Sequence, residues 1–325
     1  MILCEQYNTL TGTIAKLEPD EVVPALAQRD AVLWVDLQNP EESELNWLQQ
    51  TFNFHPLALE DVRNQRQRAK VDRYTGYYFF VMRAIHHHPR AHRVDSTQVN
   101  LFIGLNYLVT VHREPIAALD DARARWEESR LPAEATSYLF YLVTDAVVDS
   151  YFPVIDAIGD LIDDLDKELL SKPTRATIGI IFDLRRSLLT IRKILAPQRD
   201  AFNELIRSEE GGKIFHLEQT RVYFSDVYDH ILRQTDFVDT YRDMLSGSMD
   251  AYQSSLSNKL NENMQRLTVA ATVLATSTVI TGFFGMNLQG MGINSPWPYG
   301  GLLTLIILVV ITVIEIWIFY RMKWI

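Results

Sequence analysis

The sequence predicts an α/β domain followed by long helices and, at the carboxyl-terminal end, two membrane-spanning helices. Three observations support this fold class. Stretches rich in β-branched and aromatic residues alternate with helix-like stretches over residues 1–130. Helical periodicity then dominates the chain. Finally, no Asp, Glu, Lys or Arg occurs between Arg266 and Glu315, and two apolar runs, 267–284 and 300–320, are each about as long as a bilayer-spanning helix.

Composition excludes several classes of function. The 325 residues carry a formal net charge of −10, whereas nucleic-acid binding needs a basic surface, so we expect no nucleic-acid partner and regard small cations as the natural counter-species. The single cysteine, Cys4, excludes an internal disulfide and a cysteine-based zinc site. The first ten residues do not resemble a cleavable signal peptide. Because no phosphate-binding glycine loop, HExxH site or catalytic triplet is visible, we expect neither an enzyme nor a bound cofactor.

Residues 1–130 form the predicted cytoplasmic α/β domain. Strands are expected where β-branched and aromatic residues cluster, at 31–37, 77–85, 99–103 and 107–112. Asn39 and His55 precede the first turns of two expected helices, 40–52 and 56–64.

Residues 131–212 form a predicted cytoplasmic helical hairpin, broken near Lys172 and Pro173. Its first segment carries acidic residues that include Asp145, Asp149, Asp156, Asp160, Asp163, Asp164, Asp166 and Glu168. Its second segment carries basic residues that include Arg175, Arg185, Arg186, Arg192, Lys193 and Arg199. We therefore expect an antiparallel, salt-bridged pair of helices. The alternative is that the acidic face also collects divalent cations.

Residues 213–266 form a predicted stalk helix that continues into the first span. One face of this helix, which we call the seam, carries mostly small, hydroxylated or amide residues: Asp250, Ser254, Ser257, Asn261, Met264, Thr268, Ala271, Ala275, Thr278 and Gly282. A self-stabilising coiled coil would place branched apolar residues there. Several copies packed around an axis would instead line a narrow, wettable tube, with a mostly acidic approach that begins near Asp226. Since two spans cannot enclose a path, such a tube requires a homo-oligomer.

Residues 267–325 form a predicted transmembrane hairpin with a basic end: a first span at about 267–284, an outer loop at 285–299 and a second span at about 300–320. Basic residues precede the first span and follow the second, whereas the loop has no charge. The positive-inside rule therefore places both termini in the cytoplasm, and we expect the inner (plasma) membrane. For Glu315, inside the second span, the alternatives are pairing with Lys259 or Arg266, snorkelling to the headgroups, or a role in proton coupling.

Several short motifs together resemble the CorA family of divalent-cation channels and transporters. They are GMN at 285–287 after the first span, YFSDVYDH at 223–230, DAYQSSLSN at 250–258, and His55-Pro56-Leu57 in the α/β domain. GMN alone is only a tripeptide, but between two terminal spans with these companions it is specific, and the resemblance covers nearly the whole chain.

The resemblance implies a funnel-shaped homopentamer that moves Mg²⁺, and with it Co²⁺ or Ni²⁺, into the cytoplasm. Carried over by position, the outer filter would be Gly285, Met286 and Asn287, the polar rings Thr278, Asn261 and Asp250, and the apolar gate Met264 and Leu267. Cytosolic Mg²⁺ bridging neighbouring subunits would close the pore. Asp226 occupies one expected ligand position, Asp250 is a further candidate, and the position opposite Asp226 falls on His88.

Two alternatives stay open at this stage. Imidazole suits zinc, nickel or cobalt better than magnesium, and the loop 288–299 lacks Asp and Glu, so Zn²⁺ uptake as in the related ZntB branch, with or without proton coupling, is the first. The second is a membrane-anchored sensor or scaffold that conducts no ions.

Overall fold

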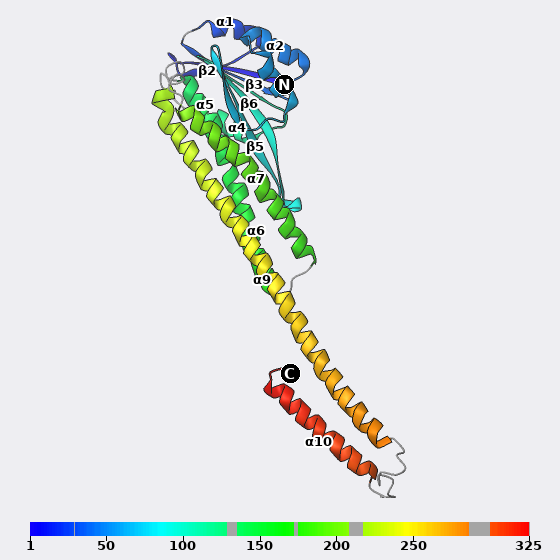
Figure 1. Cartoon of the computed structure of the whole chain (residues 1–325). Helices are drawn as coiled ribbons and strands as arrows, with labels where there is room; N and C mark the ends of the chain where they lie inside the picture. The colour runs from blue at the N-terminus through cyan, green and yellow to red at the C-terminus, as the bar shows by residue number, and fades with distance from the viewer. Residues whose placement is uncertain (29, 129–134, 172–174, 208–216, 286–299, 325) are drawn as a thin grey trace. The chain divides into compact units, whose positions relative to one another are not determined.

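The structure is a computed structural model of the chain, and it describes all residues except 29, 129–134, 172–174, 208–216, 286–299 and 325 (Figure 1). The chain divides into two compact units, Met1–Ser246 and Gly247–Ile325. Helix α9 (Leu217–Gly285) contributes its first part to one unit and its second part to the other.

The first unit is built on a seven-stranded sheet with the strand order β2-β1-β3-β7-β6-β5-β4. The strands are β1 (Ile2–Asn8), β2 (Thr13–Leu17), β3 (Ala31–Gln38), β4 (Lys70–Tyr74), β5 (Tyr77–His88), β6 (Arg93–Ile103) and β7 (Tyr107–His112). Strands β3 and β7 pair in parallel, and every other neighbouring pair is antiparallel. The four strands that the sequence predicts are confirmed, and β5 and β6 are longer than expected.

Short helices surround the sheet. They are α1 (Val22–Leu26), α2 (Glu42–Phe52), α3 (Pro56–Asn64) and α4 (Ala117–Glu128). Both predicted helices are confirmed, and their starts have local causes. Glu41 and Glu44 form a capping box at the start of α2, and the His55 imidazole accepts a hydrogen bond from the backbone N–H of Leu57 at the start of α3. Beneath them, Phe54 stacks on Phe102 of the sheet with ring centroids 4.0 Å apart.

A charged network lies in the core of this domain, where β1, β3 and β7 meet α4. His112 Nε2 lies 3.2 Å from Asp36 Oδ1, and Thr110 donates a hydrogen bond to the same oxygen at 2.5 Å. Arg123 donates to the other Asp36 oxygen at 3.1 Å and to Glu5 at 3.0 Å. His112 and Glu5 are 3% and 2% exposed. Because each buried charge has an opposite partner, the network is tolerated inside the fold.

Long helices form the other half of the first unit: α5 (Ala135–Asp149), α6 (Tyr151–Ser171), α7 (Arg175–Arg207) and the first part of α9. Figure 1 shows these helices running side by side. The sequence predicts one acidic segment where the structure has α5 and α6, separated at Ser150. The expected pairing of opposite charges across the hairpin stays a prediction, and Arg192 of α7 forms an ion pair, at 3.1 Å, with Asp239 of α9.

The second unit consists of the rest of α9 and α10 (Gly300–Arg321), which runs back alongside it (Figure 1). Among the described residues, three helical stretches are long and apolar enough to cross a membrane. One of them, Thr136–Leu169, has an apolar window that is 67% buried, so it belongs to the core of the first unit. The apolar windows of Thr220–Gly285 and Thr304–Arg321 are only 6% and 0% buried. Two helices with this much exposed apolar surface fit a bilayer better than water.

Candidate ion path and metal centre

The seam of α9 is uncovered along its whole length. All ten of its residues, from Asp250 to Gly282, are exposed in the single chain. The residues of α9 that become partly or fully buried between 265 and 280 are Gln265, Val269, Thr272, Val273, Thr276, Ser277 and Ile280. At about 100° per residue, the middle of this covered face lies roughly 120° around the helix from the middle of the seam. Helix α10 therefore packs on one side of α9 and leaves the seam available.

The threonines of the seam present oxygen lone pairs to the outside. The Thr268 hydroxyl donates to the carbonyl oxygen of Met264 at 2.8 Å, and the Thr278 hydroxyl donates to that of Leu274 at 2.7 Å. Each hydroxyl hydrogen is thus committed to its own helix, and each oxygen remains an acceptor. Such oxygens can contact a cation or the water molecules around it.

The predicted pore residues lie as follows. Asp250, Asn261 and Thr278 are exposed on α9, and the proposed gate side chains Met264 and Leu267 are 64% and 71% exposed. Gly285 is the last residue of α9, whereas Met286 and Asn287 lie outside the described residues. One chain has no enclosed path, so the pore and gate assignments stay predictions.

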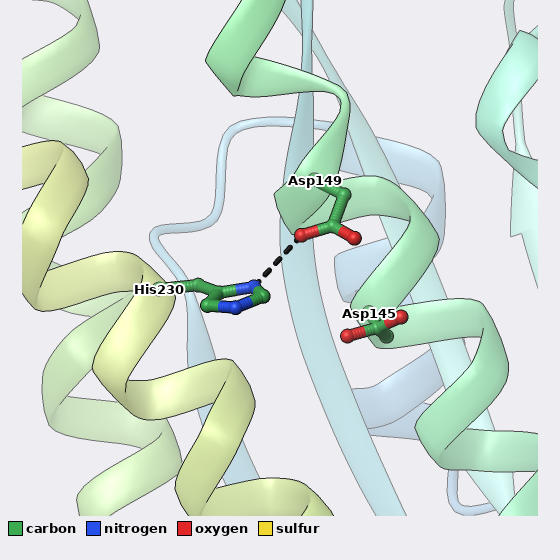
Figure 2. Close-up of side chains that lie close together, drawn as sticks. All are labelled: Asp145, Asp149 and His230. Carbon is green, nitrogen blue, oxygen red and sulfur yellow. Dashed lines mark hydrogen bonds and ion pairs between the residues drawn. The ribbon is translucent and has the colours of Figure 1, made fainter.

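A three-residue cluster in the first unit brings together side chains that could hold a metal ion. It joins Asp145 and Asp149 of α5 to His230 of α9, and one ligand atom from each lies within 4.8 Å of the others (Figure 2). His230 Nδ1 lies 2.8 Å from Asp149 Oδ1. Its Nε2 lies 3.8 Å from Asp226 Oδ1, one helical turn earlier in α9. The predicted ligand Asp226 therefore stands at the edge of this cluster.

The charges of the cluster are only partly compensated. Asp145 is 4% exposed, and Arg125 of α4 donates to its Oδ2 at 2.7 Å. Burial raises the pKa of Asp145, and the nearby charge of Asp149 acts in the same direction, although Arg125 opposes both. Two carboxylates and an imidazole are common ligands of divalent metals, and the imidazole favours zinc, cobalt or nickel over magnesium. The residues present therefore fit a divalent cation.

His88 lies at the end of β5, in a different surrounding. Its Nε2 is 3.2 Å from Asp95 Oδ1, across the β5–β6 ladder. Both residues line a pocket of about 570 Å³ that also contains His86, His87 and Glu114. Burial and two neighbouring imidazoles lower the pKa of His87. Within the single chain, the described contacts of His88 and of Asp226 do not bring the two together. Their predicted contact is between subunits, and it stays a prediction.

Sequence reasoning did not assemble the cluster, although its members were visible. Asp145 and Asp149 belong to the acidic face that was considered as a collector of cations, and His230 ends the motif at 223–230. The available signal was the spacing, because Asp145 with Asp149 and Asp226 with His230 are each one helical turn apart. Which two helices face each other could not be taken from that spacing.

Comparison with known proteins adds three findings. A family model described as CorA-like Mg²⁺ transporter protein matches residues 29–321. The cobalt/magnesium transport protein CorA of Thermotoga maritima is 36% identical over 276 residues, which cover 84% of this chain and 77% of that protein. The zinc transport protein ZntB of Klebsiella pneumoniae is 26% identical over 319 residues, covering 96% and 93%.

A solved structure resembles the whole fold. The CorA magnesium transporter of Methanocaldococcus jannaschii superposes with a TM-score of 0.86 over 100% of this chain and 99% of that one, at 24% sequence identity. The α/β domain, the long helix and the carboxyl-terminal apolar helices therefore belong to an established architecture.

Proposed function

Because the chain belongs to the CorA family of divalent-cation transporters, we propose that it carries Mg²⁺ through the membrane into the cytoplasm, down the electrochemical gradient. A family of transporters agrees with the expectation that the protein is not an enzyme. The observation that carries the proposal is the exposed seam of mostly small, hydroxylated or amide residues on α9, which α10 leaves uncovered. An inside-negative potential of 100 mV contributes about 4.6 kcal/mol for a divalent ion, so no other energy source is needed.

The seam becomes a path only when several copies turn it toward a common axis. We propose a homopentamer in the inner (plasma) membrane, with the second part of α9 lining the pore, α10 outside it and both termini in the cytoplasm. The order of polarity supports this arrangement. Asp250 and Asn261 precede the apolar gate formed by Met264 and Leu267, and Thr278 follows it toward the filter.

Neutral oxygens suit this cation. Mg²⁺ gives up its water reluctantly and usually keeps several water molecules. Rings of Thr278 and Asn261, and an outer filter of Gly285, Met286 and Asn287, would contact the ion through those waters. Conduction requires binding that is weak enough to release the ion, and amide or hydroxyl oxygens bind a divalent cation less tightly than carboxylates do.

We propose that transport is regulated by cytosolic divalent cations bound in the first unit. Asp145, Asp149 and His230 supply ligands, with Asp226 at the edge. Asp226 also remains the proposed contact to His88 of a neighbouring copy. A cation at Asp226 would neutralise facing acidic surfaces and hold the subunits in a closed arrangement.

The test is cation flux into liposomes containing the purified chain, measured for Mg²⁺, Co²⁺, Ni²⁺ and Zn²⁺. Asn287→Ala should abolish transport, and Asp226→Lys should relieve inhibition by internal Mg²⁺. Asn261 and Asn263 form a matched pair, because both are exposed amides on α9 and only Asn261 lies on the seam. Asn261→Ala should reduce flux and Asn263→Ala should not. Absence of flux for every cation, or equal effects of the two asparagine variants, would refute the proposal.

A second candidate function is Zn²⁺ uptake. It is favoured by the imidazole of His230 in the three-residue cluster and by the similarity to a zinc transport protein. The same liposomes decide between the two. Zn²⁺ entry that follows an imposed pH gradient, with no competition from Mg²⁺, would replace magnesium as the proposed cargo.

A further inference from the structure

One carboxyl group lies inside the apolar part of the second unit. Glu315 is the only charged residue of α10 before Arg321. Its Oε1 accepts a hydrogen bond from the Thr276 hydroxyl of α9 at 2.6 Å. Its Oε2 is buried and has no hydrogen-bond partner among the residues that the structure describes. The structure thus gives Glu315 a partner on the neighbouring helix, where the sequence suggested Lys259 or Arg266.

The hydrogen bond of Thr276 differs from those of its neighbours in α9. Four other threonines of the same stretch donate to a carbonyl oxygen of their own helix: Thr268, Thr272, Thr278 and Thr281. That local bond is the usual choice of a threonine within a helix. The Thr276 hydroxyl instead donates to the other helix, so the contact is specific to the packing of α9 on α10.

The contact also has a defined place around α9. Thr276 lies on the face covered by α10, about 100° around the helix from Ala275 and about 160° from Thr278, both of which are on the seam. Apolar side chains in a membrane pack without strong directional preference, since lipid is as apolar as they are. A single directional bond between two helices can therefore select one rotation and one axial register.

We propose that Glu315 is a positioning residue, which holds α9 through Thr276 at the rotation that directs the seam toward the ion path. This inference rests on the proposed function. It assigns Glu315 a role on the back of the pore-lining helix, away from the ion. Glu315 fixes the rotation of α9 by accepting a hydrogen bond, so an amide oxygen at this position should serve nearly as well as a carboxyl oxygen.

The experiment measures two quantities in liposomes: Mg²⁺ flux, and labelling of an Ala275→Cys seam cysteine by a water-soluble thiol reagent. The chain without that substitution is the labelling control, because its single Cys4 is buried. Thr276→Val and Glu315→Leu remove the bond, whereas Thr276→Ser and Glu315→Gln retain a donor and an acceptor. Thr272→Val is the matched control, since it removes a hydroxyl that donates only to its own helix.

Interhelical hydrogen bonds in membranes have measured strengths that correspond to about three-fold to twenty-fold in an equilibrium. We expect Thr276→Val and Glu315→Leu each to lower flux and seam labelling by about that factor. Thr276→Ser, Glu315→Gln and Thr272→Val should stay within about two-fold of the parent. The double variant of Thr276→Val with Glu315→Leu should be no worse than the more severe single variant, because both remove the same bond.

Several outcomes would overturn the inference. They are Glu315→Gln as damaging as Glu315→Leu, Thr276→Val indistinguishable from Thr272→Val, or additive effects in the double variant. If Thr276→Val and Glu315→Leu fail to assemble while the two conservative variants assemble, the rescue itself supports the bond. Absence of both flux and seam labelling in the parent would overturn the proposed function and this inference with it. If the parent conducts normally and Thr276→Val and Glu315→Leu change neither flux nor seam labelling, this inference is overturned but the proposed function is not.

Discussion

The buried pair of Asp36 and His112 should make the stability of the α/β domain depend on pH in a defined direction. Burial favours neutral His112, but the hydrogen bond and charge of Asp36 outweigh it and raise the pKa of His112 above its ordinary value. Burial likewise disfavours ionised Asp36, but His112, Thr110 and Arg123 together lower the pKa of Asp36. Each ionised group is thus favoured in the folded state.

The sign of the effect follows from these directions. A histidine with a raised folded pKa contributes stability that is fully present below the unfolded pKa, about 6.5, and is lost as pH rises through the folded pKa. An aspartate with a lowered folded pKa contributes stability that is present above about 3.9 and is lost as pH falls through the folded pKa. The pair should therefore stabilise most between about pH 4 and pH 6.5.

The substitution His112→Gln tests this. It leaves Asp36 with Arg123 and Thr110 but removes the imidazolium. Removing one partner of a buried ion pair typically costs about 3–5 kcal/mol, and the remaining arginine should place this case at about 3 kcal/mol near pH 5.5. At pH 9 the loss should be smaller, since the stability that the raised pKa of His112 contributes declines as the pH rises above the unfolded pKa.

The measurement is thermal unfolding of the full-length protein in detergent at pH 5.5, 7 and 9, followed by tryptophan fluorescence. Trp34 is a suitable reporter, because its indole N–H donates to Thr110 at 3.1 Å and its ring lies 4.8 Å from the Arg123 guanidinium carbon. His88→Gln is the control, since His88 is exposed and outside the network. The reasoning is wrong if His112→Gln has the same pH dependence as the parent, or if the gap between them widens toward pH 9.

Three further predictions concern the helical part of the first unit. Gly179→Ala in α7 should stabilise by about 0.5–1 kcal/mol, because alanine is the better helix former and the new methyl group meets open space; thermal unfolding in detergent measures it, and destabilisation would contradict it. Gly159→Ala should stabilise less than Gly179→Ala or should destabilise, since its Cβ would lie 2.4 Å from the Tyr241 hydroxyl oxygen. Tyr241→Phe removes that oxygen, so in its presence Gly159→Ala should recover part of the difference in unfolding temperature from Gly179→Ala. Arg125→Met should destabilise by about 3 kcal/mol, because the buried Asp145 carboxyl loses its partner. Added Co²⁺ should restore part of the lost unfolding temperature. An unchanged unfolding temperature of Arg125→Met without Co²⁺ would refute the stabilising role of the Arg125–Asp145 ion pair.

The strands that the sequence predicts are those whose high content of apolar residues distinguishes them from the rest of the chain. β3 and β7 are buried and rich in valine and leucine, so composition alone predicts them. Three strands are not predicted from the sequence. β1 is missed because it mixes apolar residues with Glu5, Gln6 and Asn8. β2 and β4 are missed because they are short and carry exposed or half-buried polar residues such as Lys16, Asp72 and Arg73. They lie at the two edges of the sheet, where strands are commonly polar.

The candidate sites also divide into one that the sequence predicts and others that only the fold brings together. The seam is a periodic property of one helix, so the sequence contains all of it, and the structure adds that α10 covers another face. The cluster of Asp145, Asp149 and His230 depends on the approach of α5 to α9. That approach is set by contacts such as the hydrogen bond from Gln234 to the carbonyl oxygen of Val148. Residues 86 positions apart in sequence have no local signal that they will meet. The pairing of Glu315 with Thr276 likewise required the fold.

The committed hydroxyl hydrogens of Thr268 and Thr278 also bear on the sign of the permeating charge. At these two positions the O–H groups already point into the helix backbone, so the hydroxyls have no hydrogen left to donate to chloride. Discrimination against anions at these two threonines would then arise from the internal bonding of the helix, and it would survive salt concentrations that screen exposed acidic residues such as Asp250.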